Sequence, residues 1–470
     1  MPARRKDGTR LAVLLMAPFL AQADATIVNV ATPSIGVDLG ASGAALELVV
    51  GGYLIAYAVL LITGARLGQT HGYRRIFLFG LAGFGGASLL CGLAPGPATL
   101  VIARVLQGAG AALMYPQALT GIQLNFVGPA RARAIGSLAL ALAGGAVAGQ
   151  ILGGVLISAD LANSGWRAIF LVNMPIVVAG AAGALRYLPA DHERGSRRVD
   201  LAGVATLSAS LLLVVLPLTL GRAEGWPAWV WVCLAASAPA FGAFLTTQRR
   251  EAARGGNPLI NLRALSRPAI YWGLLGLLTA TGTYYALLFT LAQYLQGGLG
   301  RSALFSGLVL LPWVASFGLA GQITRRLPAR LGPLVPGAGY LLMATAYLLI
   351  SADLLTGRFH EALLPALLGV GGLGLGSGFN ALIAHLTGAV PSRYAADISG
   401  VSTTTLQIGA AVGVAAFGTV YLGLAHRAGA VHATYAFAIT TLALAGTALI
   451  AAASAYLATH VGTAVDGNAE

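Results

Sequence analysis

Charged side chains are scarce in this chain. Only 9% of its 470 residues are Asp, Glu, Lys or Arg, whereas 57% are apolar, and an ordinary soluble protein carries roughly 25% charged residues. A soluble fold of this length does not cover its surface with so few charges. The scarcity therefore argues against a water-soluble globule and favours lipid as the solvent around most of the chain.

Cysteines and ligand-binding patterns are equally sparse. Cys91 and Cys233 each lie within an apolar run, which indicates buried thiols rather than a disulfide or a metal site. The seven histidines are scattered, and the sequence has no phosphate-binding loop of the Walker type. No pairing of a nucleophile with a base emerges either. We therefore expect no enzyme, no metal site and no bound cofactor.

The basic residues are spread over short loops instead of forming one patch. The formal net charge is +13, and Lys6 is the only lysine. Nucleic-acid-binding proteins gather such charge on one face, so the distribution argues against nucleic acid as a partner. Met1–Arg10 resembles the basic start of a signal peptide, but many apolar runs follow it, and we expect an uncleaved first helix.

Fourteen apolar runs are long enough to cross a bilayer, which takes about 20 residues. We therefore predict an all-α membrane protein with 14 transmembrane helices. The runs lie at 11–35, 46–68, 76–94, 99–124, 135–158, 168–188, 200–221, 226–247, 269–296, 304–324, 333–352, 361–386, 398–423 and 434–458.

The loop charges orient these spans. With the N-terminus placed in the cytoplasm, 22 of the 28 basic residues fall in cytoplasmic segments and five in outer ones, while Arg104 lies inside a span. Such a bias is the pattern of the positive-inside rule. It predicts a multi-pass protein of the cytoplasmic membrane with both termini in the cytoplasm.

Two polar segments, 190–200 and 248–267, bracket the seventh and eighth spans. They predict a six-helix bundle, a two-helix insert with its loops, and a second six-helix bundle, at 1–190, 191–267 and 268–470. A glycine-bounded basic turn after the second span resembles a turn after the tenth, at 64–75 and 321–332. Repeated halves with a site between them are a common plan of transporters.

Asp24 is the most informative polar residue because it lies inside the first span. A carboxylate there is costly unless it is paired, hydrated or protonated. Arg104 lies at a similar depth in the fourth span, and arginine stays charged in proteins. We expect Arg104 to pair with Asp24 and to bias it toward proton release. A packing role for Asp24 and a purely structural ion pair stay open. We interpret Glu47 as a solvated boundary residue, with a secondary proton role as the alternative.

Gly145, Gly149 and Gly153 recur at a spacing of four in the fifth span, so they share one helix face. Small residues at this spacing permit close helix approach. If the glycine face also serves function, we expect it to act as a pivot between the halves. The glycine-rich segment 371–376 lies within a span with no strand before it. We interpret that segment as helix packing as well.

Seven segments carry a further pattern, at 24–33, 67–75, 100–108, 145–154, 166–175, 293–296 and 400–420. Taken in order, they resemble the major facilitator superfamily, and specifically its fourteen-helix drug:proton antiporter branch. The resemblance covers nearly the whole chain and implies that Asp24 and Arg104 couple transport to protons.

The resemblance also implies a gating loop and an antiporter motif, each with one departure from the family pattern. Gln69 stands where the family usually has an aspartate thought to latch the halves, and Gln150 where it usually has a proline. The loop residues are Gly68, Gln69, Gly72, Arg74 and Arg75, and the motif residues are Gly145, Gly149, Gln150, Gly153 and Gly154.

A central cavity that opens alternately to each side is implied as well, lined by spans one, four, nine and twelve. Each candidate lining residue has an interhelical hydrogen bond as its alternative role. Such a cavity suits a cationic or amphipathic organic molecule, with Asp24 as its counter-charge. Beyond the Asp24–Arg104 pair, the candidates are Asn29, Gln107, Tyr284, Gln293 and Asn380.

Together these features predict a monomeric, proton-coupled exporter of drugs or of a small organic natural product. A dedicated carrier for an amino acid, a sugar or a siderophore is the alternative within transport, and sodium is the alternative coupling ion. A membrane sensor would carry a sizeable soluble domain, whereas the longest polar segments here reach only ~20 residues.

Overall fold

The computed structural model describes residues 2–160, 163–190, 200–221, 224–256, 258–259, 262, 267–324, 326–356, 362–388, 395–425 and 429–461. Within these ranges some side chains, that of Gln69 among them, lie outside the description. All regular structure in these ranges is helical. Helices suit a lipid solvent because each satisfies its own backbone hydrogen bonds. The predicted all-α class is confirmed.

Fourteen helical spans in the described residues are long and apolar enough to cross a membrane, as predicted. Each overlaps a run chosen from the sequence, and the ends differ because several helices continue past their apolar stretch. The spans are Asp7–Leu39, Gly43–Leu61, Tyr73–Gly92, Pro97–Asn125, Leu140–Ala159, Gly165–Tyr187, Leu201–Gly221, Ala228–Ala253, Pro268–Gly298, Ala303–Thr324, Val335–Leu355, Leu363–Gly388, Val401–Leu424 and Ala430–His460.

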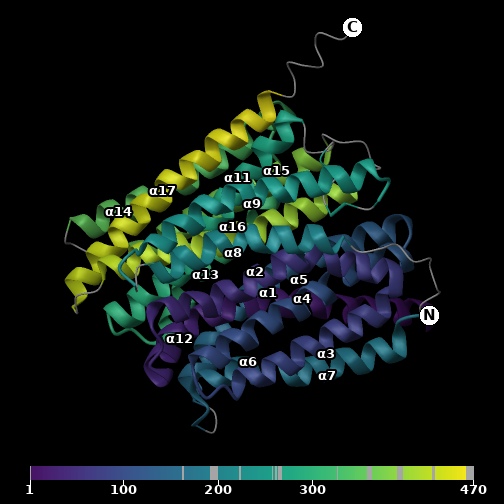
Figure 1. Cartoon of the computed structure of the whole chain (residues 1–470), viewed down its shortest axis with the longest axis horizontal. Helices are drawn as coiled ribbons and strands as arrows, with labels where there is room; N and C mark the ends of the chain where they lie inside the picture. The colour runs from purple at the N-terminus through teal and green to yellow at the C-terminus, as the bar shows by residue number, and fades with distance from the viewer. Residues whose placement is uncertain are drawn as a thin grey trace. The chain divides into compact units, whose positions relative to one another are not determined.

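The first compact unit comprises residues 1–209 and 250–259. Within it α4 packs against α2 and α3, α1 packs against α5, and α3 lies beside α7 (Figure 1). Its helices are α1 (Pro2–Leu39), α2 (Gly43–His71), α3 (Tyr73–Gly92), α4 (Pro97–Asn125), α5 (Gly128–Ala159), η2 (Gly165–Arg167), α6 (Ala168–Leu171) and α7 (Asn173–Tyr187).

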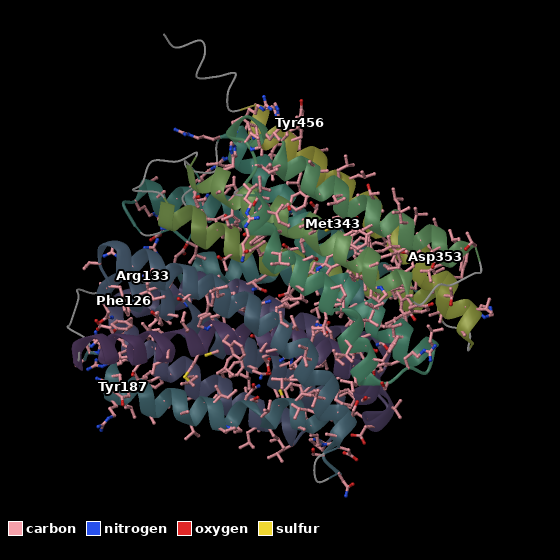
Figure 2. All side chains as sticks on the ribbon, turned by 180° about the vertical axis from the view of Figure 1, so that it is seen from behind. Phe126, Arg133, Tyr187, Met343, Asp353 and Tyr456 are labelled. Atoms are coloured by element: carbon pink, nitrogen blue, oxygen red, sulfur yellow. The ribbon has the colours of Figure 1, made fainter. Side chains whose placement is uncertain are left out.

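The second unit comprises residues 210–249 and 260–470. In this unit α15 packs against α13 and α14, and α11 packs against α16 and α17. Met343 lies midway along α14, and Asp353 lies near the end of that helix (Figure 2). The helices are α11 (Pro268–Ala292), the π-helical η3 (Gln293–Gly298), α12 (Ala303–Val309), α13 (Leu311–Thr324), η4 (Ala329–Leu331), α14 (Val335–Leu355), α15 (Leu363–Gly388), α16 (Ala395–Leu424) and α17 (Ala430–His460).

Two further helices, α8 (Leu201–Gly221) and α9 (Ala228–Ala253), correspond to the predicted insert. Asp200 begins α8, because its Oδ1 accepts a hydrogen bond of 2.8 Å from the Gly203 backbone N–H. The far end of α8 belongs to the second unit, where Thr419 of α16 donates to the Leu218 carbonyl over 2.8 Å. The predicted division at 190 and 267 stays a prediction.

The two units repeat one packing plan. A Cβ added to Gly108 of α4 would meet the backbone of Tyr53 on α2, and a Cβ on Gly372 of α15 would meet the backbone of Trp313 on α13. These contacts make α15 the counterpart of α4 and α13 the counterpart of α2. The same plan sets Trp313 where the first unit has Tyr53.

A second pair of contacts relates α1 and α5 to α11 and α16. A Cβ on Gly149 would meet the Ala23 carbonyl, and a Cβ on Gly413 would meet the Gly282 carbonyl. Four residues earlier, Gly145 and Gly409 repeat the arrangement against Phe19 and Leu278. Contacts within each unit are therefore enough to match the residues of one unit to those of the other.

Candidate functional site

Asp24 and Arg104 form an ion pair inside the first unit. Arg104 Nη1 donates to Asp24 Oδ2, and both side chains have 0% relative exposure. The pair joins α1 to α4, the two helices whose matched depths suggested it. A buried pair of this kind is strongly destabilising to break but adds little net stability over an apolar pair.

The second carboxylate oxygen of Asp24 is held by two amides. Gln107 Nε2 donates to Asp24 Oδ1 over 2.8 Å, and Asn173 Nδ2 of α7 donates to the same atom over 3.0 Å. Gln107 Oε1 in turn accepts a 2.6 Å hydrogen bond from Arg104 Nη1. All of these donors favour the ionised carboxylate, which only accepts hydrogen bonds.

Ser88 of α3 fixes the orientation of both amides. Its Oγ donates to the Phe170 carbonyl over 2.9 Å and accepts from Gln107 Nε2 at 3.1 Å and from Asn173 Nδ2 at 3.0 Å. The sequence did not single out Ser88, since a serine in an apolar span is ordinary. Asn173 lay in the quoted segment 166–175 without a role, and the structure places it against Asp24.

Arg104 is held on its far side by α2. Its Nε donates to the Val49 carbonyl over 3.0 Å, and its Cζ lies 4.3 Å from the centroid of the Tyr53 ring. Tyr53 is anchored in turn by its hydroxyl, which donates to the Ala21 carbonyl over 2.8 Å. Arg104 Nη2 is buried and has no hydrogen-bond partner among the described residues. One nitrogen of the guanidinium, with its two N–H donors, is therefore left without a partner among the described residues.

The glycine face of α5 covers the turn of α1 that carries Asp24. Gln150, where the family pattern has a proline, donates from Nε2 to the Thr26 carbonyl over 3.2 Å, a bond that proline cannot make. Gly154 is buried on the same helix. The glycine contacts on α1 are Gly145 with Phe19, Gly149 with Ala23 and Gly153 with Ile27.

The predicted gating loop is a single-residue turn between α2 and α3. Gly72 has φ of 94°, a left-handed value that favours glycine. Gly68 lies against the Gln117 side chain. Arg74 Nη2 donates to the Leu185 carbonyl over 2.6 Å. Arg75 is exposed, and the side chain of Gln69 lies outside the described residues.

Two further polar residues of the first unit, Asn29 and Glu47, are also buried. Asn29 Nδ2 donates to the Ala25 and Thr26 carbonyls of its own helix, each over 3.2 Å. Glu47 is only 2% exposed, so its interpretation as a solvated boundary residue is wrong. The start of α2 is covered by the surrounding helices, which its local sequence does not reveal.

The second unit holds the other three predicted cavity residues on separate turns. Tyr284 is half-buried and stacks on Trp313. Gln293 begins η3 and is buried, and Asn380 is exposed and donates to the Gly376 carbonyl over 2.8 Å. A cavity shared by these residues with Asn29 and Gln107 stays a prediction.

In the second unit, neutral residues hold the positions of the ion pair. Asp24 follows Ala23 as Thr283 follows Gly282, and Arg104 precedes Gly108 by four residues as Leu368 precedes Gly372. The buried charged side chains of the described residues all lie in the first unit, and they are Asp24, Glu47, Arg104 and Asp200.

The described residues contain no group of three or more His, Cys, Asp or Glu side chains that could hold a metal ion. Cys91 and Cys233 are free thiols. Cys91 lies beside the cluster, where its Sγ donates to Gln107 Oε1 over 3.6 Å. The arrangement thus gathers a carboxylate, a guanidinium, two amides, a hydroxyl and a thiol in one buried cluster.

Comparison with known proteins gives a consistent family. Residues 14–414 match the model of the Major Facilitator Superfamily. The chain is 36% identical over 427 residues to the "Probable actinorhodin transporter" of Streptomyces coelicolor, covering 90% of this chain and 74% of the relative. It is 37% identical over 427 residues to a cephamycin export protein of Amycolatopsis lactamdurans, covering 88% of this chain and 84% of the relative.

A solved structure shows the same fold. A bacterial homologue of the human lysosomal transporter Spinster superposes with a TM-score of 0.69, covering 98% of each chain at 19% sequence identity. At that identity the likeness speaks for the arrangement of helices alone.

Proposed function

The chain belongs to the major facilitator superfamily, and from this premise we propose that it exports an organic natural product or drug in exchange for protons. The relatives named for actinorhodin and cephamycin support a small organic molecule as cargo. The single observation that carries the proton part is the buried pair of Asp24 and Arg104. The membrane would be the cytoplasmic one, crossed by the multi-pass chain 14 times.

Proton exchange at Asp24 would act through its three polar partners, Arg104, Gln107 and Asn173. A proton on the carboxyl group cancels the charge that Arg104 faces and converts one acceptor oxygen into a donor. Gln107 and Asn173 both donate to Oδ1, so protonation there forces at least one amide to turn away. The pair therefore has two distinct hydrogen-bonded arrangements, which is the property a proton-driven alternating mechanism needs.

The membrane supplies energy on the scale of this change. One charge that crosses 100 mV corresponds to about 2.3 kcal/mol, and breaking a buried ion pair costs about 3–5 kcal/mol. A pH gradient together with a membrane potential is therefore of the right magnitude to drive the pair between its two arrangements. Sodium, the alternative coupling ion, would need a set of oxygen ligands, whereas Asp24 is surrounded by N–H donors.

Uphill efflux from intact cells, or uphill uptake into inverted vesicles, measured with and without a proton uncoupler, tests this function. We expect the uncoupler to stop efflux and Asp24→Asn to abolish uphill efflux while it leaves downhill exchange of substrate measurable. Vesicles loaded with potassium instead of sodium should behave identically. Efflux that survives the uncoupler, or uphill efflux by Asp24→Asn, would rule out the proton mechanism. Transport of several chemically unrelated dyes would favour a multidrug exporter over a dedicated carrier.

Cytoplasmic termini are part of the proposal. Phe126, Arg133 and Tyr187 lie at one end of the first unit (Figure 2), and Arg10 Nε donates to the Tyr187 carbonyl over 3.1 Å. The basic residues of several loops therefore gather where α1 begins, and the positive-inside rule places that end in the cytoplasm. A cysteine placed at Ser42, at the other end of α1, should react with an impermeant thiol reagent in intact cells. If this cysteine reacted only after lysis, the proposed orientation would be wrong.

A further inference from the structure

The second unit holds three aromatic rings in a parallel stack that crosses α11, α13 and α14. The ring centroids of Tyr284 and Trp313 are 5.9 Å apart with planes 10° from parallel. Those of Trp313 and Tyr347 are 5.8 Å apart at 22°. Both pairs fall in the range of offset stacking. Below, Tyr284, Trp313 and Tyr347 are called the aromatic stack.

Trp313 and Tyr347, the two buried rings of the aromatic stack, are closely packed by their neighbours. Trp313 is 1% exposed and Tyr347 is fully buried. A Cβ on Gly371 of α15 would collide with the Trp313 ring, so the glycine leaves the space that the indole fills. The Tyr347 hydroxyl donates to Thr283 Oγ1 over 3.4 Å. The glycine-rich segment of α15 thus shapes a preorganised surface in addition to packing helices.

The aromatic stack occupies the place that the charged cluster takes in the first unit. By the repeat, Trp313 stands where Tyr53 stands, and Thr283, the hydroxyl acceptor of Tyr347, stands at the position of Asp24. The two units thus share one arrangement of helices but carry different side chains at these corresponding positions. The described part of the second unit has no buried charged side chain, so recognition there depends on shape and stacking.

The outer ring, Tyr284, differs from its two partners in exposure. It is half-buried, whereas Trp313 and Tyr347 are buried. Its ring stacks on Trp313 and meets the Tyr285 ring edge-on. A stack that served only the core would cover its last ring too. The half-buried ring instead offers an aromatic surface that another flat molecule can extend.

We propose that the Tyr284 end of the aromatic stack binds a planar, polycyclic aromatic part of the transported molecule, with planarity rather than charge as the selected property. The proposal rests on the transport function proposed above and adds the substrate class. A flat ring system adds one more offset pair to an existing stack without ordering any new side chain. A branched or globular cation of equal size gains no such contact.

Equilibrium binding to the purified full chain in lipid nanodiscs, with no gradient, tests the proposal. The probes are ethidium, which is planar, and tetraphenylphosphonium, a cation of non-planar shape. We expect Tyr284→Leu to weaken ethidium binding about three- to tenfold, the scale of one stacked pair, and to leave tetraphenylphosphonium binding unchanged. Tyr284→Phe should bind both probes like the wild type. Tyr435→Leu, which removes an exposed tyrosine of α17, is the matched control.

A second pair of variants perturbs the aromatic stack through α15, which packs against Trp313. Gly371→Ala displaces the Trp313 ring without touching Tyr284, and we expect it to weaken ethidium binding selectively. Gly369→Ala is its control, because a Cβ there meets Pro312 at an ordinary 3.4 Å. Tyr284→Met fills the volume without a ring and replaces Tyr284→Leu if that variant does not fold.

Three outcomes would overturn the proposal. They are wild-type protein that does not bind ethidium, a Tyr284→Leu variant that binds it normally, and a variant that loses both probes equally. Because no gradient is present, these outcomes are independent of proton coupling. Uncoupler-insensitive efflux, by contrast, would remove the proton mechanism and leave the binding result intact.

Discussion

The first unit places a buried ion pair where α1 meets α4, whereas the second unit places Thr283 and Leu368 at the corresponding positions of α11 and α15. The helices around these positions pack through the same glycine contacts in both units. One helical scaffold therefore accepts either a charged or a neutral centre. The charged centre is not needed to hold such a bundle together.

That difference separates stability from function. Replacing a buried pair by apolar residues of similar size is often neutral or stabilising, and the second unit shows an apolar and aromatic solution in the same fold. Asp24 and Arg104 therefore carry a cost that folding alone does not require. The predictions below test this contrast, beginning with the charged pair itself.

Replacement of Asp24 and Arg104 by Thr and Leu, the residues at the corresponding positions of the second unit, should have the largest effect on stability and efflux. Asp24→Thr alone leaves the Arg104 guanidinium buried without a carboxylate, and we expect a loss of about 3–5 kcal/mol in unfolding free energy together with loss of uphill efflux. Asp24→Thr with Arg104→Leu should recover most of the stability and none of the efflux. Thermal unfolding in detergent and vesicle efflux measure the two quantities. A double variant as unstable as the sum of the single ones would show that the pair is not a unit.

The matched glycines should give the next largest effect. Gly149→Ala and Gly413→Ala each force a Cβ into a neighbouring carbonyl, and we expect about 1–3 kcal/mol of destabilisation for each. Uphill efflux should fall more for Gly149→Ala, because Ala23 adjoins Asp24. Gly144→Ala, with no atom within 4 Å of its added Cβ, is the control. Equal losses of efflux in the two glycine variants would remove the special role of the α1–α5 contact.

Asn173 tests whether the charged centre depends on more than its ion pair. Asn173→Ala removes one donor from Asp24 Oδ1 and one from Ser88 Oγ. A buried acceptor that loses a partner costs about 1–3 kcal/mol, so we expect uphill efflux to fall about tenfold, which corresponds to about 1.4 kcal/mol. Ser88→Ala leaves every direct donor to Asp24 in place and should lose less. Normal efflux by Asn173→Ala would confine the site to Asp24, Arg104 and Gln107.

The smallest effect should come from two matched helix caps. Ser42 accepts from the Ala45 N–H at the start of α2, and Ser302 accepts from the Phe305 N–H at the start of α12. Alanine at either position should cost about 1 kcal/mol in unfolding free energy, equally in both units, with efflux unchanged. Thermal unfolding of the two variants side by side checks the equality. A clear difference between them would limit the repeat to the helix interiors.

The helices and the charged pair were predictable for simple physical reasons. Each span is a continuous apolar run, and no other backbone form satisfies itself in lipid. The pairing of Asp24 with Arg104 follows from depth, since helical rise is constant. Depth does not reveal direction around a helix, and for that reason Ser88 and Asn173 were missed as partners of the carboxylate.

The aromatic stack lay beyond sequence reasoning because its members are far apart in the chain. Tyr284 was predicted as a cavity residue, but Trp313 and Tyr347 lie in other spans and resemble ordinary apolar residues there. The prediction that Glu47 is solvated was wrong for a different reason. Its local sequence is that of a helix start, and only the packing of neighbouring helices buries it.

The arginines at one end of the first unit have a consequence of their own. Arg74 donates to the Leu185 carbonyl, and Arg131 donates to the Phe126 and Gln123 carbonyls at the end of α4. Neither a guanidinium nor a peptide carbonyl changes its protonation over the physiological pH range. These hydrogen bonds of Arg74 and Arg131 therefore persist whether the medium is acidic or alkaline. The buried carboxylate of Asp24, by contrast, belongs to a residue type that can take up a proton, so acidity can act on its pair with Arg104 while these contacts at the helix ends persist.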